Sequence, residues 1–85
     1  MRIEFSPTAL RNLRSLPEKT TAACVEFIYG DLAESPLRVG KPLHGELEGQ
    51  YSARRGTYRI VYSISNGDNP VIRIARVDHR RDVYR

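Results

Sequence analysis

The stretch YSARRGTYRIVYSIS, residues 51–65, decides the fold because it contains two β-strands and the turn between them. Apolar and polar side chains alternate from Tyr58 to Ser65, the two-residue period of a strand with one buried face. Gly56-Thr57 predicts a turn, and Tyr51 to Arg55 predicts the strand before it. The large side chains that we expect to face the core are Tyr58, Ile60, Tyr62 and Ile64.

Two more strands are predicted outside this hairpin. Residues 65–70 are rich in turn formers, and the β-branched side chains of Val71 to Asp78 favour a third consecutive strand. Met1 to Phe5 alternates apolar and charged residues and predicts a short N-terminal strand.

The segment between these strands predicts two helices. Ser6-Pro7 has the residue types of an N-cap followed by proline at the first helical position. Pro17 ends this first helix and opens a second, which we expect to reach about Leu32. Residues 34–50 contain five Gly and Pro residues and predict a connection without regular structure.

This order of elements, β-α-α-β-β-β, predicts an α+β fold in one small domain over residues 1–85. We expect an N-terminal strand, a two-helix hairpin and an antiparallel three-stranded meander, with the helices packed on one face of the sheet.

Positive charge is concentrated in the C-terminal part of the chain. Eight of the twelve arginines lie between Arg54 and Arg85, where the net charge is +5, while residues 1–53 carry −1. Arginine binds phosphate oxygens bidentately, so this asymmetry favours a polyanion partner. The alternative is a solvated face that keeps the protein soluble, because charge alone gives information about partners and solubility and not about the fold.

Several other classes of site find no support in the sequence. Cys24 is the only cysteine, so the chain cannot form an internal disulfide, and one Cys with two His is a poor basis for a zinc site. The carboxylates are scattered singly, without a paired-carboxylate site or a magnesium cluster. We therefore expect no metal and no cofactor. There is no apolar run of membrane-spanning or secretory length, so we expect a cytoplasmic protein without membrane contact.

The arginines of the hairpin suggest a binding surface. Arg54 and Arg59 belong to consecutive strands joined by a tight turn, so their side chains can lie close together. Alternation places Arg59 on the face opposite Tyr58 and Ile60. Converging arginines repel each other unless an anion lies between them, which favours a phosphate site.

An ordered set of short motifs closely resembles the RelE toxins of bacterial toxin–antitoxin pairs, and their actinobacterial members most. The motifs are KPL at 41–43, LEG at 47–49, YSARRG at 51–56, YRIVY at 58–62, VDHR at 77–80 and VYR at 83–85. The resemblance spans essentially the full chain and includes its length and order of elements.

The resemblance also implies roles for individual residues. Arg59 matches the sheet arginine that contacts the scissile phosphate, and Arg80 matches a second phosphate-stabilising arginine. Tyr84 matches the tyrosine that orients the reacting nucleotide. Arg54 and Ser52 stand where well-studied members have lysines, and arginine is a poor proton donor or acceptor because of its very high pKa.

Proton transfer would then fall to His79 or Tyr84, unless catalysis is chiefly electrostatic. Asp78 beside His79 is compatible with an acid–base pair, and a surface histidine in a turn is the alternative. The arginines expected to bind the RNA backbone are Arg55, Arg73, Arg76, Arg81 and Arg85.

The activity implied by the resemblance is metal-independent cleavage of messenger RNA in the ribosomal A site. The 2′-OH attacks the adjacent 3′-phosphate, and a positive cluster stabilises the developing charge. The implied partners are the ribosome with its rRNA, the mRNA and a RelB-like cognate antitoxin. Operator DNA would be bound only by the toxin–antitoxin complex.

Two other functions are the alternatives to this activity. ParE-type toxins are similar in fold but poison DNA gyrase and lack the ribonuclease residues. A non-catalytic nucleic-acid-binding module, or a repressor partner of an antitoxin, would use the arginines only to hold phosphates.

Overall fold

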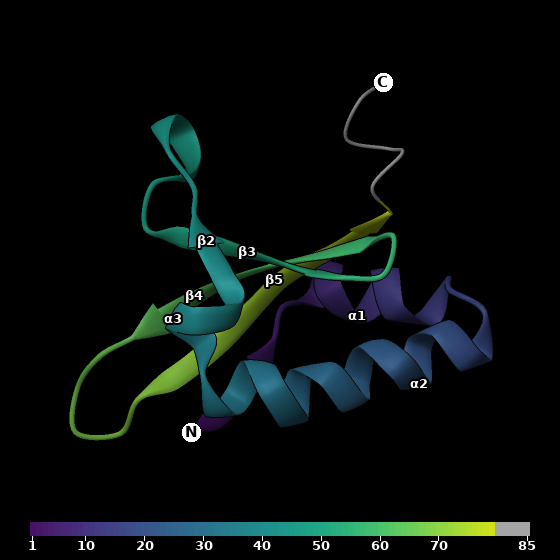
Figure 1. Cartoon of the computed structure of the whole chain (residues 1–85), viewed down its shortest axis with the longest axis horizontal. Helices are drawn as coiled ribbons and strands as arrows, with labels where there is room; N and C mark the ends of the chain where they lie inside the picture. The colour runs from purple at the N-terminus through teal and green to yellow at the C-terminus, as the bar shows by residue number, and fades with distance from the viewer. Residues whose placement is uncertain (80–85) are drawn as a thin grey trace.

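The computed structural model describes residues 1–79, which form a five-stranded sheet with helices on one face (Figure 1). The strands are β1 (Arg2–Phe5), β2 (Gly40–Pro42), β3 (Gln50–Arg55), β4 (Tyr58–Ser65) and β5 (Val71–His79). The helices are α1 (Pro7–Arg14), α2 (Glu18–Phe27) and α3 (Pro36–Val39), with a π-helical turn at Ile28–Leu32 and a 3₁₀ turn at Gly45–Leu47.

Within residues 1–79 the strand order is β1-β5-β4-β3-β2, and only the β1–β5 pair is parallel. The predicted N-terminal strand, helical hairpin and antiparallel meander are all confirmed. The prediction for residues 34–50 was wrong in part, because this segment supplies α3 and the edge strand β2. The short length of β2 and the density of Gly and Pro conceal it from periodicity arguments.

The first helix begins where the sequence predicts. The Ser6 side chain accepts a hydrogen bond from the Ala9 backbone N–H, and Pro7 takes the first helical position. The second helical segment also reaches Leu32, although its last turn is π-helical rather than α-helical.

The core lies between the sheet and the two longer helices, α1 and α2, which Figure 1 shows side by side beneath the strands. Its fully buried members include Ile28 and Leu32 from the helical side and Ile60, Tyr62 and Ile74 from the sheet. The predicted inward face of β4 is therefore confirmed. The opposite face, which we call the open face, carries none of the residues of this cluster.

Candidate nucleic-acid interface

The register of the sheet divides the arginines of the hairpin between its two faces. Ala53 pairs with Ile60, and both are buried in the helix-side core. The next pair along the same strands is Arg54 with Arg59, so alternation places both arginines on the open face. The predicted proximity of these two residues is borne out by their direct pairing across strands.

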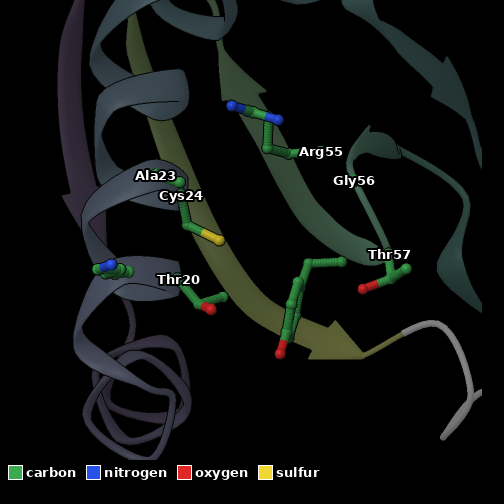
Figure 2. A pocket seen from close by; sticks show the side chains of 8 residues that line it. Thr20, Ala23, Cys24, Arg55, Gly56 and Thr57 are labelled. Carbon is green, nitrogen blue, oxygen red and sulfur yellow. The ribbon is translucent and has the colours of Figure 1, made fainter.

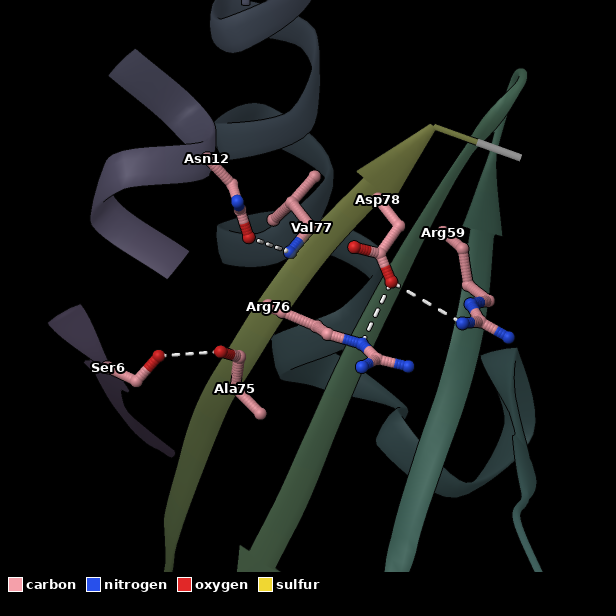
Figure 3. Close-up of polar contacts among 7 residues, drawn as sticks. All are labelled: Ser6, Asn12, Arg59, Ala75, Arg76, Val77 and Asp78. Carbon is pink, nitrogen blue, oxygen red and sulfur yellow. Dashed lines mark hydrogen bonds and ion pairs between the residues drawn. The ribbon is translucent and has the colours of Figure 1, made fainter. Parts of the chain in front are cut away.

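The open face continues onto β5, where Asp78 pairs with Arg59. Arg59 Nη2 lies 3.4 Å from Asp78 Oδ2, and Arg76 Nε lies 2.8 Å from the same oxygen. Figure 3 shows the two guanidinium groups on either side of this carboxylate. The predicted cluster of arginines thus contains a carboxylate at its centre.

The Nε atoms of Arg59 and Arg76 are both buried and make no hydrogen bond. Arg76 Nε lies within ion-pair distance of Asp78 Oδ2, but its N–H does not point at the carboxylate and therefore makes no hydrogen bond to it. A buried donor without an acceptor is unfavourable, and an anion that supplied oxygens here would satisfy it.

A second row of paired residues lies beside the first on the open face. Lys41 pairs with Ser52, Ser52 with Val61, and Val61 with Arg76. Lys41 is exposed, whereas Val61 is fully buried although it lies outside the helix-side core. Sequence reasoning missed Lys41 because β2 was not recognised. Its position in the KPL motif was the available signal.

A β-bulge brings Arg76 and Asp78 onto the open face. Val61 pairs with Arg76 but Tyr62 pairs with Ile74, so Ala75 is the extra residue on β5. The Ser6 hydroxyl donates to the Ala75 carbonyl oxygen over 2.6 Å (Figure 3). The Ile74 carbonyl oxygen accepts a hydrogen bond from the Ser6 N–H. The bulge therefore has a fixed attachment to the start of α1.

Arg73 also lies on the open face, in the row in which it pairs with Ser63, and it is exposed. Among the predicted RNA-binding residues, Arg73 and Arg76 therefore share a face with Arg54 and Arg59.

Arg55 and His79 lie on the other face. Both pair with Tyr58, whose ring packs against the helix-side core, and the Tyr58 and His79 ring centroids are 4.9 Å apart. His79 Nε2 also lies 3.4 Å from the Thr57 hydroxyl. The structure therefore does not bring His79 together with Arg59, since consecutive strand residues point to opposite faces.

Arg55 lines a cavity of about 270 Å³ between α2 and the β3–β4 turn (Figure 2). Cys24 contributes its buried thiol to the wall, and burial raises the pKa of this thiol, with the Arg55 charge acting in the opposite direction. A buried thiol with a raised pKa is unreactive, as expected for a structural cysteine.

Four predicted site residues lie outside the described residues, namely Arg80, Arg81, Tyr84 and Arg85. Within residues 1–79, no three His, Cys, Asp or Glu side chains gather in a way that could hold a metal ion. None of the helices in that range is long and apolar enough to cross a membrane.

The sheet therefore has one face covered by helices and one face that carries a cluster of arginines. Residues 3–84 match the family model described as the ParE toxin of type II toxin–antitoxin systems, parDE, and the chain belongs to this family.

The most informative relatives are mycobacterial. The chain is 55% identical over 83 residues to Toxin RelG of Mycobacterium tuberculosis, covering 98% of this chain and 94% of RelG. It is 54% identical over 76 residues to Toxin RelE of the same organism, covering 87% of this chain and 78% of RelE. The crystal structure of the M. tuberculosis toxin–antitoxin complex RelBE2 matches with a TM-score of 0.87 and 53% identity, over 93% of this chain and 96% of the other. The predicted actinobacterial RelE-like character is confirmed.

Proposed function

We propose that this protein is a ribosome-dependent mRNA endoribonuclease that inhibits translation and is neutralised by a cognate antitoxin. The proposal rests on one observation, which is the clustering of Arg54, Arg59 and Arg76 on the open face of the sheet. Relatives named RelG and RelE, each more than half identical to the chain, support it.

In the proposed reaction, the ribose 2′-OH attacks the adjacent phosphate and the 5′-oxygen of the next nucleotide leaves. The products are a 2′,3′-cyclic phosphate and a free 5′-hydroxyl. Arg59 and Arg54 would donate hydrogen bonds to the phosphate oxygens on which negative charge develops. The small size of the chain is the reason for proposing that the ribosome positions the RNA.

The placement of His79 supports the chiefly electrostatic form of this mechanism. Its ring packs edge-on against Tyr58 on the helix side, away from Arg59. Proton transfer by Tyr84 stays a prediction, as does the phosphate contact of Arg80.

Lys41 extends the proposed RNA-binding surface. It lies on the edge strand in the row next to Arg54, and Arg73 lies on β5 one row further along the open face. Both would bind the RNA backbone, since phosphate contacts position the nucleic acid without reading its sequence.

The antitoxin is the proposed partner because the matching mycobacterial structure is a toxin–antitoxin complex. Operator binding would belong to that complex. A cytoplasmic location follows from a ribosomal target.

Translation of a defined message in vitro, followed by mapping of its 5′ ends, tests the proposal. We expect truncated messages with wild-type protein and loss of cleavage by about 10²–10³-fold in Arg59→Ala, because one charged donor is removed. Arg14→Ala, on α1, is the matched control and should cut like wild type. A folded Arg59→Ala variant with wild-type cleavage would overturn the assignment.

The family description favours one alternative, a ParE-type poison of DNA gyrase. Such a protein would leave messages intact and translation unaffected while it inhibits supercoiling of plasmid DNA by gyrase. The two assays together separate the functions.

A further inference from the structure

Asp78 lies at the centre of the cationic cluster, where it shares one carboxylate oxygen between two arginines. Oδ2 is 3.4 Å from Arg59 Nη2 and 2.8 Å from Arg76 Nε (Figure 3). The Arg59 and Asp78 side chains are only 24% and 25% exposed. This contact is therefore less screened than a typical surface ion pair.

The strand register alone would leave the two guanidinium groups unfavourably close. Arg59 and Arg76 project from neighbouring strands on the same face, and like charges at this spacing repel each other. One shared carboxylate compensates this repulsion and restricts two long, flexible side chains to one arrangement.

The arrangement also leaves donors available. A guanidinium group has five N–H donors in a fixed plane, and Asp78 contacts one nitrogen of each arginine. For Arg59 this nitrogen is Nη2, and its buried Nε makes no hydrogen bond. For Arg76 it is Nε itself, so the two Nη nitrogens of Arg76 lie outside the contact. An oxyanion with several oxygens could satisfy these donors without displacing Asp78.

We propose that Asp78 is a positioning residue, which orients Arg59 and Arg76 so that both act on one phosphate group. The inference rests on the proposed function for the identity of that phosphate. Its negative charge must also weaken RNA binding, since it lies within the surface that attracts the polyanion. Positioning and attraction are thus opposed in a single side chain.

Because Asp78 positions the arginines but repels RNA, Asp78→Asn should change RNA binding and cleavage in opposite directions. The variant keeps the shape of the side chain but removes its charge, so single-stranded RNA should bind about two- to fivefold more tightly, the range of one partly exposed charge interaction. Cleavage of ribosome-bound message at saturating toxin should fall on the order of tenfold, because the arginines are no longer held in place. Asp68→Asn is the control, since it removes the same charge from the exposed β4–β5 turn.

A nuclear magnetic resonance measurement of the arginine side chains tests the same inference without activity. Wild-type protein should show two slowly exchanging Nε–H signals, from Arg59 and Arg76, because both nitrogens are buried. Both should exchange at least tenfold faster in Asp78→Asn, where the side chains are no longer held in this buried arrangement. Asp68→Asn should leave them unchanged. These signals report on Asp78 even if the wild-type protein does not cleave message, in which case the proposed function fails by itself.

Three results would overturn the inference. Weaker RNA binding together with slower cleavage would make Asp78 an ordinary structural or RNA-contacting residue. If Asp78→Asn behaved like Asp68→Asn, the ion pairs of Asp78 would have no role in positioning the arginines. Rapidly exchanging Nε–H signals in the wild-type protein would show that the arginines are not held.

Discussion

A Cβ atom on Gly40 would overlap the hydroxyl oxygen of Tyr62. The close approach exists because the Tyr62 hydroxyl donates a hydrogen bond to the Pro36 carbonyl oxygen, directly beside the start of β2. Tyr62 is fully buried, so this bond satisfies a polar group that would otherwise lack a partner. Gly40 is thus required by space and not by its backbone, which is extended with φ −109°.

Gly40→Ala should therefore destabilise the protein. The added methyl group must displace Tyr62 or move β2, and overpacking of this kind costs about 1–3 kcal/mol. For a chain of this size, each kcal/mol corresponds to a fall of roughly 4–8 °C in the melting temperature. Gly67→Ala is the control, because a Cβ there meets nothing within 4 Å. Equal melting temperatures for the two variants in thermal unfolding would contradict the packing argument.

The same tyrosine predicts a loss of stability at high pH. Burial, followed by the nearby Tyr51, raises the pKa of Tyr62 from 10.0 to about 12. Its contribution is fully present below about pH 10, where the phenol is neutral in both states. It is lost as the pH rises toward about 12, because the unfolded chain releases its proton first.

We expect the free energy of unfolding to fall by up to about 1.4 kcal/mol per pH unit in that window, and Tyr62→Phe to remove this component. Urea unfolding of both proteins at several pH values measures it. The Cys24 thiol also has a raised pKa, but it is present in both proteins and cancels in the difference. Parallel pH profiles for the two proteins would show that Tyr62 does not titrate with folding.

Arg54 and Arg55 are adjacent in sequence and lie on opposite faces of the sheet, which makes them a matched pair. Arg54→Gln should weaken single-stranded RNA binding and lower the slope of log K against log salt by about 0.7, the value for one phosphate contact. Arg55→Gln removes the same charge from the cavity side and should leave the slope unchanged. Binding titrations at several salt concentrations measure these slopes. Equal slopes for the two variants would count against an RNA surface on the open face.

That pair also shows what the sequence could and could not predict. Alternation along β4 correctly placed Ile60 and Tyr62 in the core and Arg59 on the other side. Applied to β3, the same alternation separates Arg54 from Arg55, so the separation was available from the sequence. The assignment of Arg55 to the RNA backbone came instead from charge, which carries no information about direction.

Two features of the sheet could be recognised only from the tertiary structure. Strand β2 is three residues long and becomes regular only by pairing with β3, so its periodicity does not reveal Lys41 as part of the surface, and only the KPL motif points to this residue. In β5, the bulge at Ala75 shifts the phase of the alternation, so that Ile74 and Val77 both face the core although they are three positions apart. A strict two-residue period would place Arg76 in the core, and only the pairing partners show otherwise.

Ser6 connects that bulge to the fold and gives the last prediction. Its hydroxyl accepts from the Ala9 N–H at the start of α1 and donates to the Ala75 carbonyl oxygen over 2.6 Å. Ser6→Ala removes both contacts, and loss of an N-cap alone costs about 0.5–2 kcal/mol. Ser15→Ala is the control, since the Ser15 hydroxyl makes one exposed bond to Asn12.

Because the bulge sets which face carries Arg76 and Asp78, Ser6→Ala should also alter the cationic cluster in the molecules that remain folded. We expect faster exchange of the Arg59 and Arg76 Nε–H protons in Ser6→Ala, in conditions where thermal unfolding shows the variant to be native. Exchange as slow as in Ser15→Ala would mean that the bulge keeps its geometry without Ser6, and that the β4–β5 pairing alone determines the arrangement of the site.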